Sequence, residues 1–399
     1  MLKPRWCFLG VLLSMCSAFA YFWLFPQHAG DHFFITIYLL IGYYTVIAVV
    51  SDRQIYIKKS FARCLPKALG KYLFWGLLLL CASGLYNNHS FYRDNFPGTI
   101  KFFDNYLSLF LYLGLPYFIL AEKFRSSAFN YYHDPYLRFL SLVKHALKGN
   151  LSLVGHRIIR GYYRQFFVSL VLRAHYLAIM VDQIYLYHGR TLENLQQARL
   201  GMADITVLIA LLTSLAWSID ANNASMGYFW ESDFTKTRFR GIDPYPIHWL
   251  VTLVCYHPFN LFAYTFIPYA ATPADQSLLL DGAALRLTVD ILGVVFLAGY
   301  IYAGSSLNFS CSNLSYKKIQ TGGLYSIVRH PATFFKMGFL FLAVFKFRAS
   351  WIPITLSAYV IWTTIYVLRT LCEERYLKRF EDYRAYMQKV PYRIIPGIF

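Results

Sequence analysis

The run FFITIYLLIGYYTVIAVV at residues 33–50 carries no charged side chain. A helix that crosses a bilayer needs roughly 20 predominantly apolar residues, so this run is long enough to cross one. Further stretches of the same character lie at about 6–25, 71–86, 104–121, 166–187, 203–219, 247–269, 287–304, 333–347 and 351–371. The sequence therefore predicts an all-α fold, a polytopic integral membrane helical bundle with about ten transmembrane segments.

The composition agrees with a membrane environment. Of the 399 residues, 57% are hydrophobic and 15% are charged, and the mean hydropathy is +0.40. This polar surface is too small to coat a water-soluble globule of this size. The seven cysteines form no CxxC pair, so the sequence predicts neither a zinc site nor a disulfide framework, and no metal is expected.

The basic residues predict the orientation of the chain. Lys and Arg cluster at the N-terminus and in the second, fourth, sixth and eighth predicted loops, whereas the first loop has none. Because basic loops stay preferentially in the cytosol, an even number of spans puts both termini there. The net charge of +18 then lies against anionic membrane lipids, which are the expected partners. Nucleic acid is not expected as a partner, because the chain has no soluble domain on which charge is concentrated.

Ionisable side chains inside the predicted spans are functional candidates, because burying them in lipid is costly. The sequence contains several, among them Arg173, His175, Asp182 and Asp290. In the seventh segment His257 precedes Pro258, and a proline in mid-span frees a backbone carbonyl that needs a partner. His257 is therefore a predicted substrate contact. For the whole set, lining a substrate pocket and bonding one helix to another are equally good interpretations.

The last part of the chain carries a distinct group of motifs. A polar loop at 316–334 reads YKKIQTGGLYSIVRHPATF and leads through Arg329-His330-Pro331 into the ninth segment. Proline suits the first turn of a helix, and unpaired N–H groups at a helix start favour an anionic ligand group. Near the end of the tenth segment, Arg369 and Glu373 lie one helical turn apart.

The tail, VPYRIIP at 390–396, completes a recognisable order of motifs. An RHP run at a helix start, an Arg one turn before a Glu-Glu pair and this tail together resemble the isoprenylcysteine carboxyl methyltransferase family and related membrane phospholipid methyltransferases. The resemblance covers roughly 230–399. It divides the chain into an N-terminal multi-span membrane region, 1–229, and a methyltransferase-like membrane core with a cytosolic tail, 230–399.

The resemblance implies S-adenosyl-L-methionine as cofactor, bound in a cytosolic C-terminal site between the loop, the last two helices and the tail. Tyr325 and Glu373 match positions that contact the cofactor, and Arg369 matches an arginine near the methyl acceptor. The other cofactor positions that it implies are Lys317, Lys318, Ile319, Gln320, His330, Pro331, Ala332 and Thr333. Arg369 and Arg329 are the expected catalytic residues, and Arg369 and His257 the expected substrate-binding residues.

The chemistry of methyl transfer agrees with these residue types. The amino-acid part of the cofactor needs an acid for its ammonium group, and a carboxylate acceptor needs a cation to orient it. A carboxylate is already a nucleophile at neutral pH, whereas an amine acceptor would need a general base. The implied function is methyl transfer to a membrane-embedded or lipidic acceptor, at a carboxylate or a headgroup.

Two other functions remain open. The tail also looks like the close of the membrane sterol reductases, which use NADPH, although those enzymes typically have R-H-x-N-Y where this chain has Arg329-His330-Pro331-Ala332-Thr333. A transporter or lipid-handling protein without catalysis would use the intramembrane charges instead. The sequence lacks the corresponding broken helices in two halves that many transporters have.

Overall fold

The computed structural model describes residues 4–25, 32–51, 56–58, 60–126, 134–159, 161–198, 205–229, 239–256, 259–267, 279, 282–307 and 310–399. Its helices are α1 (Pro4–Leu24), α2 (His32–Ser51), α3 (Phe61–Asn88), α4 (Ser90–Asn95), α5 (Pro97–Lys123), α6 (Pro135–Leu147), α7 (Leu151–Ile159), α8 (Tyr162–Gln197), α9 (Ile205–Phe229), α10 (Pro246–Leu253), α11 (Phe259–Phe266), α12 (Ala283–Leu307), α13 (Pro331–Phe345), α14 (Pro353–Leu377) and α15 (Glu381–Lys389). Two short antiparallel ladders pair β1 (Tyr56–Lys58) with β2 (Phe124–Ser126) and β3 (Gly241–Ile242) with β4 (Ser315–Tyr316). Helix dominates the fold, which confirms the predicted all-α class.

The helices reproduce most of the predicted segments. Among the described residues, six helices are long and apolar enough to cross a membrane by length and composition, namely α3, α5, α8, α9, α12 and α14. Shorter apolar helices lie within α1, α2 and α13. Each predicted segment except the seventh coincides with one helix. The membrane character of the chain therefore has structural support from these six helices, and a total of ten spans stays a prediction.

The seventh predicted segment, 247–269, is not one helix. The short helices α10 and α11, of eight residues each, cover its two halves. Between them, Cys255 N and Tyr256 N donate to carbonyls three residues back, at 3.1 and 2.9 Å, as in the tight last turn of many helices. A proline at 258 has no N–H with which to continue an α-helical ladder. His257, the predicted substrate contact, lies outside the described residues, as does the proline itself.

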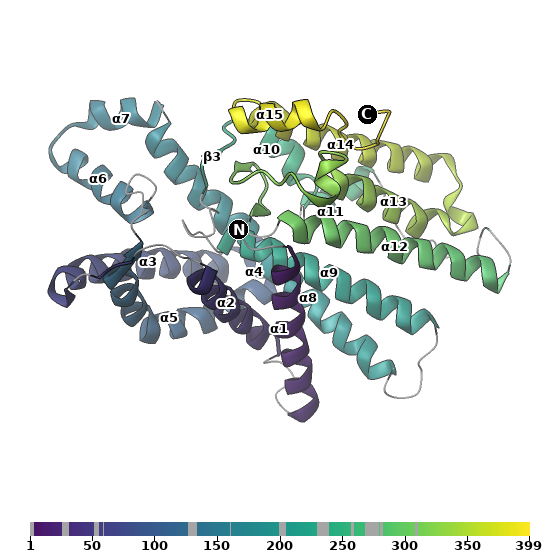
Figure 1. The fold of residues 1–399 in the computed structure, drawn as a ribbon, viewed down its shortest axis with the longest axis horizontal. Helices are drawn as coiled ribbons and strands as arrows, with labels where there is room; N and C mark the ends of the chain where they lie inside the picture. The colour runs from purple at the N-terminus through teal and green to yellow at the C-terminus, as the bar shows by residue number, and fades with distance from the viewer. Residues whose placement is uncertain are drawn as a thin grey trace.

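Helices α8 and α9 form the centre of the molecule. They pack against each other, with α5 on α8 and α12 on α9. In Figure 1, α12 to α15 gather on one side of this pair, and α2, α3 and α5 gather on the other. The motifs at the end of the chain therefore lie on one side of the bundle, next to α9.

The exposed surface of helix α3 is suited to contact with lipid. It exposes a row of leucines at intervals of three and four residues, Leu65, Leu69, Leu73, Leu77 and Leu80. Residues at this spacing share one helix face. A continuous apolar face of this kind is unfavourable in water but costs nothing against lipid tails.

Asp182 answers one question that the sequence left open. Its Oδ1 accepts a hydrogen bond from Gly98 N at 2.9 Å, so the side chain of one long helix satisfies the first turn of another. Thr99 Oγ1 strengthens the same contact by donating to Ala178 O at 2.7 Å. The first N–H groups of a helix have no partner within it and need one elsewhere. Asp182 therefore bonds α8 to α5.

Candidate functional site

The C-terminal motifs meet at one buried carboxylate, Glu374, near the end of α14. Its Oε1 lies 2.6 Å from Arg329 Nε and 3.2 Å from His330 Nε2, and its Oε2 lies 3.0 Å from Arg393 Nε. The Glu374 residue is 1% exposed, so these contacts take place away from water. They join the start of α13, the end of α14 and the tail into one unit, which we call the Glu374 hub.

Arg329, an expected catalytic residue, is buried within this hub. Its Nη1 donates to Val390 O at 2.6 Å and to Pro391 O at 2.7 Å. Its backbone N donates to Tyr392 O at 3.0 Å, and the next residue bonds the tail in the same way. The guanidinium therefore holds the tail through Nη1 and pairs with Glu374 of α14 through Nε.

Of the two neighbouring glutamates, Glu373 is the one that faces outward. It is exposed, and among the described residues it has neither a hydrogen bond nor an ion pair. It lies within electrostatic range of Tyr325, Tyr383 and Arg369, which belong to three separate parts of the site. Glu373 is therefore available to a cationic ligand group beside the hub.

Tyr325 lies in a 3₁₀ turn, Gly323–Ser326, between the polar loop and α13. Its side chain is buried, and burial raises the pKa of its hydroxyl well above the usual value. Its carbonyl accepts a hydrogen bond of 2.6 Å from the hydroxyl of Tyr386 on α15. The turn starts at Gly323 with φ of +63°, a conformation that favours glycine. Tyr325 is thereby fixed next to the tail.

The predicted cofactor loop, 317–320, follows directly on β4. Lys317 is buried and donates to Gly227 O at the end of α9, with its ammonium 4.3 Å from the ring centroid of Phe239. Burial, with a contribution from the nearby Arg173, lowers the pKa of Lys317 to about 7. Lys317 therefore anchors the loop to α9.

The remaining predicted cofactor residues lie on either side of the hub. Lys318, Ile319 and Gln320 are partly exposed, and Ile319 packs against the buried tyrosines of the α14–α15 corner. Pro331 is the first residue of α13, as its position before a helical run predicts, and Ala332 and Thr333 complete the first turn.

Arg369 lies deeper in the bundle than the hub. Its Nη2 donates to Asn313 Oδ1, and its guanidinium carbon is 5.3 Å from the ring centroid of Tyr256. Asn313 also bonds the hydroxyl of Tyr256 at 3.0 Å, and its backbone N donates to the hydroxyl of Tyr228. Arg369 therefore belongs to a polar cluster with Asn313, Tyr256 and Tyr228, between α9, α14 and the turn that follows α10.

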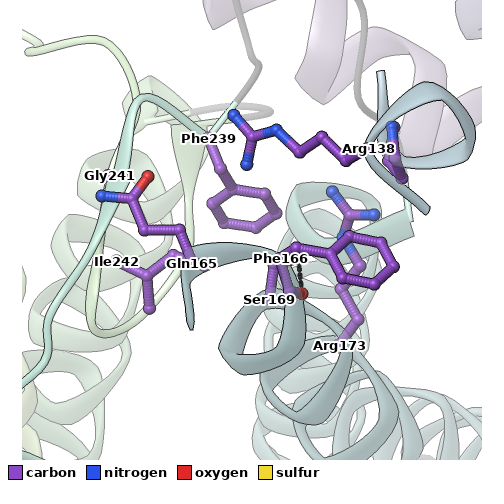
Figure 2. Close-up of a pocket in the computed structure, with 9 residues that line it drawn as sticks. Arg138, Gln165, Phe166, Ser169, Arg173, Phe239, Gly241 and Ile242 are labelled. Atoms are coloured by element: carbon purple, nitrogen blue, oxygen red, sulfur yellow. Dashed lines mark hydrogen bonds between the residues drawn. The ribbon is translucent and has the colours of Figure 1, made fainter. Parts of the chain in front are cut away.

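A separate small cavity lies between α6, α8 and β3, away from the Glu374 hub. Figure 2 shows Arg138 of α6 and Arg173 of α8 bordering it, with Phe239 between the helices and the strand. Its volume of about 30 Å³ is enough for a water molecule or two. Arg173 is one of the functional candidates from the predicted spans, whereas none of the predicted catalytic, cofactor or substrate residues lines the cavity.

Sequence reasoning missed the role of Glu374. The Glu-Glu pair was visible, but consecutive residues on a helix point about 100° apart, so only one of the two could face the tail. In the structure only Glu374 contacts Arg329, His330 and Arg393 of the motifs, and a buried guanidinium such as that of Arg329 needs a carboxylate.

No family model, curated protein or solved structure matches the chain. The family resemblance therefore rests on the order of the motifs themselves.

Proposed function

We propose that the chain is an integral membrane methyltransferase that uses S-adenosyl-L-methionine and acts on a membrane-embedded or lipidic acceptor. One observation carries this proposal. The RHP run, the Glu-Glu pair and the VPYRIIP tail are far apart in the sequence, yet all three meet at Glu374. Motifs that only resembled a family by chance would have no reason to converge on one buried acid.

The residues around the hub fit the charges of the cofactor. Glu373 offers an exposed carboxylate without a partner among the described residues, suitable for the ammonium of an amino-acid tail. Tyr325 and the loop 317–320 flank the adenosine end in this proposal, and His330 to Thr333 border it at the start of α13. When bound, S-adenosylmethionine supplies an electrophilic methyl group.

In this proposal Arg329 and Glu374 position the site, because their groups are bonded to each other and to the tail. Arg369 orients the acceptor through its guanidinium, which is held by Asn313. A carboxylate oriented in this way needs no general base, because it is ionised at neutral pH. The protein then has to supply alignment of the acceptor and exclusion of water.

Calorimetry of the purified full chain with S-adenosylhomocysteine and with NADPH tests the proposal. We expect the chain to bind S-adenosylhomocysteine and not to bind NADPH. Glu373→Gln should weaken that binding at least tenfold, because the amide cannot pair with an ammonium as a carboxylate does. Glu381→Gln, which changes an exposed acid on α15, is the matched control and should bind like the wild type.

Binding of NADPH alone would move the assignment to the sterol-reductase alternative. Binding of neither ligand would contradict both the methyltransferase and the reductase assignment and would favour a lipid-handling protein. Wild-type affinity in Glu373→Gln would contradict the role given to this residue.

A further inference from the structure

A second cavity lies at the opposite end of α13 from the Glu374 hub, where neither the motifs nor the proposed function uses it. It is formed by the start of α12, the end of α13 and the turn that follows α13, and its volume is about 150 Å³. Its walls are largely apolar and include Leu285, Val289, Phe341, Phe345 and Trp351. An apolar cavity of roughly this size can take a molecule as large as benzene, so this one has room for a segment of a hydrocarbon chain.

Two cations, Arg286 and Lys346, complete the lining of this cavity. Arg286 is the fourth residue of α12 and Lys346 directly follows α13, so both lie at the same end of these two packed helices. Lys346 Nζ pairs with Asp290 Oδ1 at 3.0 Å. The Arg286 side chain is exposed, and within the part of the chain that the structure describes it makes neither a hydrogen bond nor an ion pair. These three groups therefore leave one positive charge, that of Arg286, at this end of the cavity.

The cavity is charged at its outer end and apolar further in. Phe341 lies five residues before Lys346, which places it about 8 Å deeper along α13 at 1.5 Å per residue. Val289 lies nearly one turn deeper along α12 than Arg286. Trp351 borders the cavity from the turn after α13, and tryptophan is enriched at the level of lipid headgroups. A charged end above an apolar interior matches the two parts of a phospholipid, its phosphate and its acyl chains.

The cavity is open towards the surroundings of the helices. Three of its lining side chains, those of Leu285, Phe341 and Trp351, are exposed. Helix α12 is one of the six helices that are long and apolar enough to cross a membrane, and it exposes Ile291 and Val295. A lipid chain can therefore reach the cavity sideways from a bilayer that surrounds α12.

We propose that this cavity binds one anionic phospholipid, whose phosphate pairs with Arg286 and Lys346 and whose acyl chain fills the apolar part. A guanidinium can donate two parallel N–H···O bonds to a phosphate, which makes arginine well suited to this role. The single excess charge favours a headgroup with a net negative charge, because a choline headgroup already compensates its own phosphate.

This lipid is not the methyl acceptor of the proposed function. Lys346 lies 15 residues along α13 from Pro331, or about 22 Å from the hub end of the helix. The charge pattern places the hub on the cytosolic side, so the cavity belongs to the other leaflet. The lipid site therefore does not depend on methyl transfer.

Native mass spectrometry of the purified full chain in detergent, titrated with dioleoylphosphatidylglycerol or dioleoylphosphatidylcholine, tests this proposal. The wild type should bind one phosphatidylglycerol at least tenfold more tightly than phosphatidylcholine. Arg286→Gln should weaken phosphatidylglycerol at least fivefold and leave phosphatidylcholine unchanged. Arg93→Gln is the matched control, because it removes the same charge from an exposed side chain on α4 and should bind like the wild type. Val289→Trp, which fills the apolar part, should weaken phosphatidylglycerol as well.

Equal affinity of the wild type for the two lipids would overturn the proposal, and this comparison does not require any variant to fold. Wild-type affinity for phosphatidylglycerol in Arg286→Gln would overturn the role of the cation, and wild-type affinity in Val289→Trp would overturn the role of the cavity. Glycerol phosphate carries the charge without the chains and should not displace the lipid at a hundredfold excess. Displacement would mean that the site recognises a free phosphate and not a lipid.

Discussion

At the scale of single residues, two neighbouring glutamates divide the work of the site. Glu374 is buried and bonded to two arginines and a histidine, whereas Glu373 is exposed. The sequence predicted Glu373 as the ligand residue from its match to the motif. It could not predict the hub, because the partner Arg393 is separated from the pair by α15 and approaches only through the turn of the tail.

Glu374→Gln should destabilise the protein by about 3–5 kcal/mol, because it leaves the buried guanidinium of Arg329 without its counter-charge. Unfolding in detergent, followed by heat or denaturant, measures this loss. Glu381→Gln should stay within about 0.5 kcal/mol of the wild type, since its side chain is exposed. Equal stability of the two variants would show that the hub does not support the fold.

Lys317 should make stability depend on pH. Its pKa is lowered to about 7 in the folded protein, while the ordinary value is 10.5, so between these values the unfolded chain binds more protons at this site. Stability should therefore rise as the pH increases from about 7 towards 10, by up to about 1.4 kcal/mol per pH unit.

Lys317→Met should flatten this rise in unfolding measurements at pH 7.5 and 9.5. Lys389→Met, at an exposed position on α15, is the matched control. Parallel pH profiles for the wild type and Lys317→Met would mean that the lysine is not buried as described.

At the scale of elements, helix positions followed from apolar run length, whereas proline did not mark the breaks, since α3 and α5 contain Pro66 and Pro116. The sequence predicted nine segments that coincide with helices, because each is an apolar run between polar boundaries. The seventh, 247–269, is divided between α10 and α11, because α10 ends at Leu253 and residues 254–256 form a turn. Hydropathy records which side chains prefer lipid, and it does not mark a backbone turn within an apolar run such as the one at 254–256.

Helix α13 and the tail should behave as one unit. Truncation after Val390 removes the carbonyls of Pro391, Tyr392 and Arg393, which accept hydrogen bonds from the residues just before α13. Hydrogen exchange, measured by mass spectrometry, should then speed up at the start of α13 and at the end of α14, while α3 and α5 keep their wild-type rates. Unchanged exchange at α13 would mean that the hydrogen bonds from Arg329 to the tail do not stabilise the start of this helix.

At the scale of the whole molecule, the charge pattern predicts that both termini lie in the cytosol. Epitope tags at each end should both be digested by protease only after the membrane of intact cells is permeabilised. A tag digested in intact cells would imply an odd number of spans between the termini, or an inverted chain. The sequence does not fix the number of spans, because α13 is apolar but has 15 residues, fewer than the roughly 20 that a membrane-spanning helix needs.

The central claim is that the chain transfers methyl groups to a lipid. The most direct measurement incubates membranes that contain the full chain with S-adenosylmethionine labelled in its methyl group and counts label in the extracted lipid. Label should appear in a base-labile lipid ester with the wild type and with Glu381→Gln, and should fall at least tenfold with Glu373→Gln. Lipid label that is no higher than in membranes without the protein would contradict the claim.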